Sequence, residues 1–261
     1  PGRVRIATGP TGGLYHDFTL GIKKLLEDRF PIEVELVSTS GSNSNRRRLL
    51  GEAEAELVDL AVVQAGAVSM KNLFVVAPIY KELVHVIVRK GRGMDSIPDI
   101  DGRRVAVGLE GSGMQVSAAK VLNHYQLKVE RRSVSFRDLL TDETLDAAIV
   151  TSGVFSADLR EVLIDERFVL LPVEDAVAFE VKHFFFQSAT IPVGLYSEKP
   201  YPTPSEELKT ISTTASVVVG QDANEQLVEA ILGIIYESEL REEFPLLMDR
   251  DEAAELSTLR L

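Results

Sequence analysis

Two long extended segments, residues 73–91 and 189–204, interrupt the alternation of short strands and helices in this chain of 261 residues. The first, LFVVAPIYKELVHVIVRKG, is almost entirely strand-forming, and the second, ATIPVGLYSEKPYPTP, carries four prolines and has no helical period. Elsewhere β-rich runs alternate with helical stretches, which is typical of an α/β fold. Two α/β halves joined by two extended crossings predict a hinged pair of lobes with a cleft between them.

The crossings also set the expected lobe boundaries. We expect a discontinuous lobe I of residues 1–84 plus 195–261 and a lobe II of residues 85–194, with crossings near 80–90 and 189–200. The apolar pattern predicts strands at 4–7, 32–37, 57–63, 133–136, 147–150 and 169–173, and helices at 14–29, 45–56, 114–125 and 223–240.

Each half contains a glycine loop between a strand and a helix: GPTGGLY begins at Gly9, and GLEGSG begins at Gly108. The N–H groups and the dipole at a helix start favour an anion, and glycines let the backbone approach it closely. Thr11 and Ser112 add hydroxyl donors, although these hydroxyls can equally serve only as helix caps. GPTGGLY lacks the lysine of a nucleotide P-loop, and GLEGSG is not a G-x-G-x-x-G motif.

A third polar loop, STSGSNSNRRRLL at residues 38–50, also opens a predicted helix. It is either part of a binding site or a solvated turn with Arg46–Arg48 on an exposed face. Gln64 follows the apolar strand LAVV, so its side chain either faces a cleft or simply ends the strand.

Composition argues against several function classes. The formal net charge of −12 repels nucleic acid and anionic membranes, and the absence of cysteine excludes disulfides, thiolate catalysis and Cys-ligated metals. The four histidines show no metal-ligand spacing, there is no G-x-S-x-G elbow, and no acid/base pair stands out. No apolar run approaches the roughly 18 residues of a membrane span. Because the chain begins at Pro1 without an initiator Met, we expect a targeting or anchoring segment to have been removed.

Several motifs occur in a characteristic order: IATGPTGGLY, GSNSN before a helix, DLAVVQ, VHVIVRKG, RRVAVGLEGSG, LDAAIVTSG and IPVGLY. Together they resemble the TAXI family, the TRAP-associated extracytoplasmic immunogenic solute receptors, over essentially the whole chain. The resemblance implies a two-lobed periplasmic-binding-protein type II fold. It also implies a periplasmic or extracytoplasmic receptor, not an enzyme, that delivers a small carboxylate or amino acid, such as glutamate, to a TRAP-type transporter without any cofactor.

The resemblance also implies a set of ligand-binding residues, drawn from both lobes: Thr11, Gly12, Gly13, Tyr15, Ser42, Asn45, Gln64, Ser112, Gly113, Met114 and Gly153. The chain departs from the family pattern at three positions and in the stretch between Asn45 and Gln64, which is longer than usual. Met114 replaces a common hydroxyl residue, His16 replaces a second aromatic, and Leu195 replaces a common threonine. Two alternatives stay open, a ligand-sensing extracytoplasmic domain of a membrane-anchored protein and an enzyme on the same scaffold.

Overall fold

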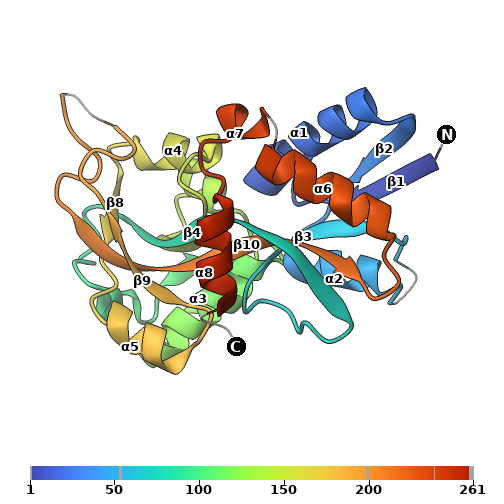
Figure 1. Ribbon diagram of the computed structural model, residues 1–261. Coiled ribbons are helices and arrows are strands. Elements are labelled where there is room, and N and C mark those ends of the chain that lie inside the picture. Colours follow the sequence, from blue (N-terminus) through green and yellow to red (C-terminus); the bar gives the residue numbers. More distant parts are fainter. Residues whose placement is uncertain (1, 53–54, 198–199, 238, 259–261) are drawn as a thin grey trace. The chain divides into compact units, whose positions relative to one another are not determined.

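The computed structural model describes residues 2–52, 55–197, 200–237 and 239–258 (Figure 1). Its contacts divide the chain into two compact units: the first runs up to Lys81 and resumes at Thr214, and the second covers Glu82–Thr213. Strands β4 (Leu73–Arg89) and β10 (Leu208–Gly220) contribute residues to both units. The lobe boundaries expected from the sequence stay a prediction; they place residues 195–213 in lobe I, whereas the contacts group these residues with the second unit.

The sheet of the first unit has the strand order β2-β1-β3-β10. Strand β1 (Gly2–Ala7) pairs in parallel with β2 (Ile32–Val37) on one side and with β3 (Leu60–Gln64) on the other, and β10 runs antiparallel to β3. Since β1, β2 and β3 are parallel neighbours, their carboxyl ends lie at one edge of the sheet. Ligands collect at such edges in open α/β sheets.

Helices cover both faces of this sheet. Helices α1 (Leu14–Arg29), α6 (Glu225–Glu237) and α7 (Leu240–Glu243) pack on one face with Ile6 and Val62, while α2 (Ser42–Leu49) packs on the other with Ala7 and Val63 (Figure 1). Successive strand residues thus point to opposite faces, as the period of a strand requires. Helix α8 (Arg250–Thr258) follows later in the chain.

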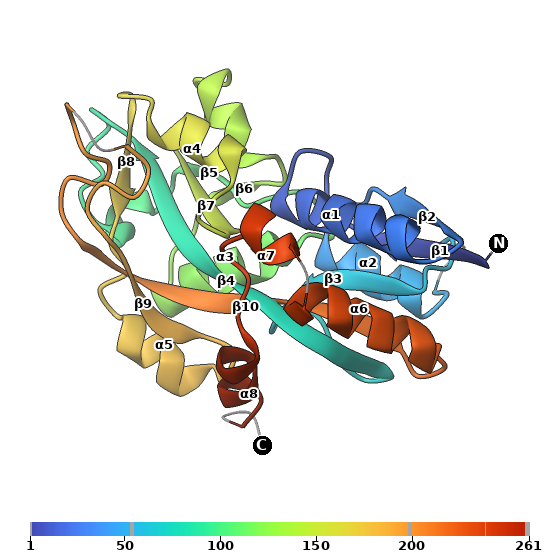
Figure 2. The same cartoon turned by 45° about the horizontal axis from the view of Figure 1, so that its top comes forward.

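In the second unit, β7 (Ala147–Ser152) lies between β4 and β5 (Arg104–Ala106). Strand β6 (Glu130–Arg132) pairs in parallel with β5, β8 (Phe168–Leu171) is antiparallel to β4, and β9 (Gln187–Ile191) is antiparallel to β10. Helices α3 (Gly113–His124) and α5 (Ala176–Lys182) and the 3-10 turn η1 (Ile97–Ile100) pack on one face. Helix α4 (Ala157–Leu163) and the 3-10 turn η2 (Phe136–Leu140) pack on the other (Figure 2).

The predicted bounds of a helix and of a strand differ from those in the structure. The helix predicted at 45–56 is α2, which begins at Ser42 and ends at Leu49, because Gly51 adopts a left-handed backbone with φ of 63°. The strand predicted at 133–136 lies earlier, at 130–132, and Phe136 opens a 3-10 turn that Ser135 caps through the N–H of Arg137. The three residues of β6 are exposed and polar, so they carry no apolar alternation to mark them as a strand.

In the part of the chain that the structure describes, no helix has both the length and the apolar character that a membrane span needs. Within the same residues, no three His, Cys, Asp or Glu side chains group in a way that would hold a metal ion.

Candidate functional site

The loop after β1 brings four of the expected ligand-binding residues to the carboxyl edge of the first sheet. Gly12 has a φ of 87°, which favours glycine, and the N–H of Gly13 donates to the Pro10 carbonyl at 3.0 Å. The N-cap of α1 is Gly13, not Thr11, and as a glycine it has no side chain with which to cap the helix. Thr11 therefore does not cap α1, so the capping alternative is wrong for this residue.

The loop after β2 brings a second helix start to the same edge. Gly41, at a φ of 128°, is the N-cap of α2, and this N-terminus too has no side-chain cap within the described residues. The first helical residue, Ser42, is buried, and its Oγ accepts a hydrogen bond from the backbone N–H of Gln64 at 2.9 Å. This bond ties the start of α2 to the end of β3, so it joins two of the expected site residues directly.

The buried side chain of Asn45 links several segments at this edge through hydrogen bonds. Its side-chain Nδ2 donates to the carbonyls of Thr8 at the end of β1 and of Val62 in β3, the latter at 2.6 Å. Its Oδ1 accepts from Thr39 Oγ1 at 2.5 Å, and the residue is completely buried. Sequence reasoning missed Thr8 and Thr39 as members of this network, although the hydroxyl-rich run at 38–44 was the signal for it. The geometry makes Asn45 a positioning residue of the edge.

The second unit has a comparable helix start after β5. Ser112 is the N-cap of α3, yet its side chain makes no cap bond. Ser112 is only 7% exposed and, among the described residues, its Oγ has no hydrogen-bond partner. Gly108, at a φ of 94°, lies directly against this hydroxyl, since a Cβ at that position would stand 2.8 Å from Ser112 Oγ. Buried hydroxyls are normally paired, so an unpaired one at a helix N-terminus calls for a partner.

Helix α3 is fixed on β7 by a buried hydroxyl pair. Ser117 Oγ lies 2.5 Å from Thr151 Oγ1, and it also reaches the carbonyl of Met114 at 3.2 Å. Because β5 and β7 are parallel neighbours, Ser112, Gly113 and Met114 after β5 lie at the same edge as Gly153 after β7. Each unit thus gathers its own share of the expected residues at one sheet edge.

A buried His–Tyr pair in the second unit was not expected from the sequence. The imidazole Nε2 of His85 on β4 and the hydroxyl of Tyr196 hydrogen-bond to each other. Burial lowers the pKa of His85 to about 4, and backbone hydrogen bonds with Leu83 and Val150 raise it by less. Burial also raises the pKa of the Tyr196 hydroxyl. His85 is therefore neutral at pH 7, and its hydrogen bond ties β4 to the segment around residue 196. Its place inside the apolar run VHVIV is consistent with this structural role.

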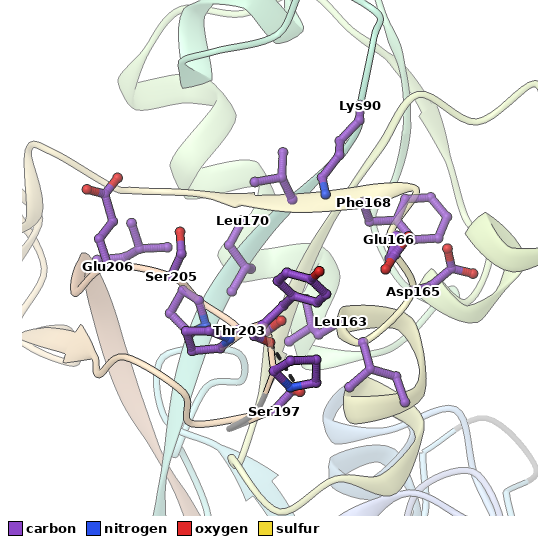
Figure 3. A pocket seen from close by; sticks show the side chains of 17 residues that line it. Lys90, Leu163, Asp165, Glu166, Phe168, Leu170, Ser197, Thr203, Ser205 and Glu206 are labelled. Carbon is purple, nitrogen blue, oxygen red and sulfur yellow. Dashed lines mark hydrogen bonds between the residues drawn. The ribbon is translucent and has the colours of Figure 1, made fainter.

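A surface cavity of about 600 Å³ opens elsewhere in the second unit (Figure 3). Its walls come from the end of α4, from β8 and from the proline-rich segment 200–206. Its charged groups are Lys90, Asp165, Glu166 and Glu206. Tyr201 on its rim is 75% exposed. None of the expected ligand-binding residues lines it, and its charged groups form no ion pair with one another in the described structure.

Comparison with solved structures agrees with this architecture. A putative L-cystine ABC transporter protein from Listeria monocytogenes matches with a TM-score of 0.59 at 14% identity, covering 97% of this chain and 98% of that one. A mutant of arginine-bound ArgBP from T. maritima matches with a TM-score of 0.58 at 16% identity, covering 93% of this chain and 96% of that one. The regulatory domain of CcmR from Synechocystis PCC6803, in complex with 2-PG, matches with a TM-score of 0.54 at 13% identity, covering 90% of this chain and 97% of that one. The fold is the α/β fold of type II periplasmic binding proteins.

A family-level comparison covers nearly the whole chain. The NMT1-like family matches residues 6–244, which include every residue of the expected ligand-binding set and most of both units. The chain therefore belongs to the NMT1-like family.

Proposed function

We propose that this protein is an extracytoplasmic solute receptor, not an enzyme, and that it binds a small carboxylate or amino acid. The observation that carries the proposal is the buried hydroxyl of Ser112, which stands at the N-terminus of α3 and has no partner among the described residues. Helices α1 and α2 in the other unit begin at glycine N-caps, Gly13 and Gly41, which have no side chain. Such helix starts donate N–H groups toward an anion, and bonds to a charged acceptor are stronger than neutral ones.

The expected ligand contacts divide into two roles. We propose direct contacts from Thr11, Gly12, Gly13, Tyr15, Ser42, Gln64, Ser112, Gly113, Met114 and Gly153. Asn45 positions these groups, because its amide is already engaged with β1, β3 and Thr39. No cofactor or metal has a role in this proposal.

The proposal also specifies the transport partner and the kind of solute. The ordered motifs from IATGPTGGLY to IPVGLY support delivery of a glutamate-like solute to TRAP-type transporter subunits by a TAXI-type receptor. Family membership and the fold of type II periplasmic binding proteins support the receptor role in its broader form. An extracytoplasmic location follows from the same reasoning.

A second candidate is a ligand-sensing domain of a membrane-anchored protein. The likeness to the regulatory domain of CcmR, solved in complex with 2-PG, favours the sensing part of this candidate, because a regulatory domain that binds a small molecule has this fold. The full-length reading frame separates the two candidates: a membrane span joined to this chain supports sensing, and a neighbouring pair of TRAP-type transporter subunits supports delivery.

Native mass spectrometry of the purified protein tests the receptor function, because tight receptors retain their solute. We expect a bound small acid to be retained, and isothermal titration with carboxylates to give one site per chain. Two results together would show that the site is misassigned. The protein would bind no carboxylate, and Thr11→Ala and Ser112→Ala would leave its melting temperature unchanged in the presence of every ligand. Chemical conversion of the solute on incubation would favour an enzyme.

A further inference from the structure

Strand β8 of the second unit has one free edge. It pairs with β4 in the register from Val86↔Leu171 to Arg89↔Phe168, and no other strand of the described chain pairs with it. An unpaired edge presents backbone N–H and C=O groups that another extended chain can pair with, and proteins commonly protect such edges with charges or prolines. The sequence of β8, FVLL, contains neither.

The hydrogen-bond alternation shows which backbone groups of β8 face this free edge. The Lys90 N–H donates to the Arg167 carbonyl at 2.8 Å, so the ladder between β4 and β8 begins with a hydrogen-bonded pair. In an antiparallel ladder, such pairs alternate with pairs whose backbone groups point away from each other. Val169 therefore directs its N–H and carbonyl toward β4, and Leu170 directs both groups outward.

The outward groups of β8 differ in whether they have partners. The N–H of Phe168, which also faces outward, donates to the Asp165 carbonyl at 3.1 Å. Within the described residues, the outward N–H and carbonyl of Leu170 make no hydrogen bond, although Leu170 is buried. Backbone polar groups away from bulk water are normally paired, so those of Leu170 call for a partner.

The surface cavity of about 600 Å³ borders this edge. Phe168, Val169 and Leu170 all line it, and successive side chains of a strand point to opposite faces of the sheet. A cavity that contacts all three residues therefore runs along the edge of the strand. Figure 3 shows Lys90 and Leu170, which both line the cavity, on opposite sides of the strand that passes between them.

The charges that line this cavity favour a cation. They are three carboxylates and one lysine. Asp165 already pairs with Arg167 at 2.7 Å, whereas Glu166 and Glu206 are exposed and form no ion pair in the part of the chain that the structure describes. The exposed ring of Tyr201 on the rim offers a further contact for a cation.

We infer that this cavity binds an extended peptide segment of a partner protein, which adds a strand to β8 and carries apolar side chains next to lysine or arginine. Leu170 supplies the main-chain hydrogen bonds, and Glu166 and Glu206 receive the basic side chains. A small organic amine would also meet the carboxylates, but an ammonium group cannot accept a hydrogen bond from the Leu170 N–H. The free backbone of β8 therefore favours a peptide.

Amide hydrogen exchange followed by NMR tests the inference on the intact chain, with the capped pentapeptide Ac-Lys-Val-Thr-Val-Lys-NH2 as probe. We expect saturating peptide to slow exchange at Leu170 at least tenfold. Val169 is the internal control, because its N–H already faces β4, and its exchange should change less than twofold. In isothermal titration, a version of the peptide that is N-methylated at every residue, and so lacks N–H donors, should bind at least tenfold more weakly.

A double variant, Glu166→Gln with Glu206→Gln, tests the charge preference. We expect it to weaken binding of the lysine peptide at least fivefold, while Glu207→Gln, which alters a neighbouring carboxylate outside the cavity lining, leaves binding within twofold. The double variant should also bind small carboxylates as the wild type does, because none of the expected ligand-binding residues lines this cavity.

Several results would overturn the inference. These are the absence of peptide binding at millimolar concentration, binding without slower exchange at Leu170, and equal binding of Ac-Glu-Val-Thr-Val-Glu-NH2. Binding of phenethylamine as tight as that of the lysine peptide would instead show a site for small amines. Each of these results would leave the proposed receptor function standing, since that function is measured separately by carboxylate titration.

Discussion

The backbone N–H of Gln64 donates to the side-chain oxygen of Ser42 across 2.9 Å, which joins the last residue of β3 to the first residue of α2. Both residues are buried, so water cannot replace either partner readily. The bond fixes where α2 begins, and with it the direction in which the N–H groups of its first turn point. The serine- and asparagine-rich loop at residues 38–45 is thereby held in one position at the edge of the sheet.

The variant Ser42→Ala should lose this bond and leave the N–H of Gln64 buried without its acceptor. We expect the free energy of unfolding to fall by about 1–3 kcal/mol, the usual cost of an orphaned buried donor. Urea unfolding followed by circular dichroism measures the change. Ser44→Ala is the matched control, since its hydroxyl pairs with Ser40 in a half-buried position, and should cost less than about 0.5 kcal/mol.

The side chain of Asn45 should tolerate even the nearest isostere poorly. Asn45→Asp replaces the Nδ2 donor with an oxygen that faces the carbonyls of Thr8 and Val62. We expect destabilisation by about 3 kcal/mol or more at pH 7, because a buried carboxylate would lie against two acceptors. Asn45→Ala should cost less than Asn45→Asp under the same urea titration; the reverse order would contradict this account of the network.

Much of the fold could be predicted from periodicity. The helix at 14–29 and the strand at 32–37 are found within the predicted bounds, and the extended run at 73–91 is the long strand β4. Helix α1 has one buried face, which leaves a helical repeat in the sequence, whereas β4 is buried along most of its length and is marked by a nearly continuous apolar run. The exposed strand β6 and the early start of α2 leave no such pattern. Gly41 and Gly51 set the limits of α2 through local backbone geometry instead.

The helix starts at the two sheet edges were predictable in their positions, and the roles of their side chains were less so. Glycine loops marked the helix starts after β1 and β5, but the sequence could not show whether Thr11 and Ser112 cap those helices, because capping depends on side-chain direction. Likewise, Asn45 as a contact and Asn45 as an internal support have the same sequence signature. The His85–Tyr196 pair joins residues far apart in the chain, which no local pattern reveals.

His85 should make the stability of the protein depend on pH. The pKa of its imidazole is about 4 in the folded protein and about 6.5 when unfolded, so the unfolded chain binds the proton first as the pH falls. The stability that neutral His85 provides is complete above pH 6.5 and is lost as the pH falls from 6.5 to 4. The total contribution over this window is about 3 kcal/mol, at 1.36 kcal/mol for each pKa unit.

Two variants separate this titration from the hydrogen bond. His85→Gln keeps a polar partner for Tyr196 without a titrating group, so its unfolding free energy, measured by urea titration at several pH values, should vary less between pH 6.5 and 4. Tyr196→Phe removes the hydrogen bond and leaves the imidazole buried, so the wild-type dependence on pH should persist. An unchanged slope in His85→Gln would show that other groups control stability in this range.

Gly108 should be sensitive to a single methyl group. Gly108→Ala combines a backbone φ of 94° with a Cβ only 2.8 Å from Ser112 Oγ and from Met114 Cβ. Gly91→Ala is the control, because Gly91 also has a positive φ of 77° but nothing lies within 4 Å of its Cβ. We expect Gly91→Ala to cost about 1 kcal/mol and Gly108→Ala to cost at least about 1 kcal/mol more. Equal melting temperatures for the two variants would mean that the loop yields without strain.

Ser112 should separate ligand binding from stability. An N-cap serine normally stabilises its helix by about 1 kcal/mol, but Ser112 makes no cap bond and its hydroxyl is buried without a partner in the described structure. Ser112→Ala should therefore leave the unfolding free energy of the ligand-free protein within about 0.5 kcal/mol of wild type while it weakens carboxylate binding roughly tenfold, the loss of about one hydrogen bond to a charged group. Ser117→Ala, five residues on, should do the opposite: it leaves Thr151 Oγ1 without its 2.5 Å partner and lowers stability by about 1–2 kcal/mol. If Ser112→Ala destabilises the ligand-free protein as much as Ser117→Ala does and leaves titrated affinities unchanged, the hydroxyl of Ser112 has a structural role and does not contact the ligand.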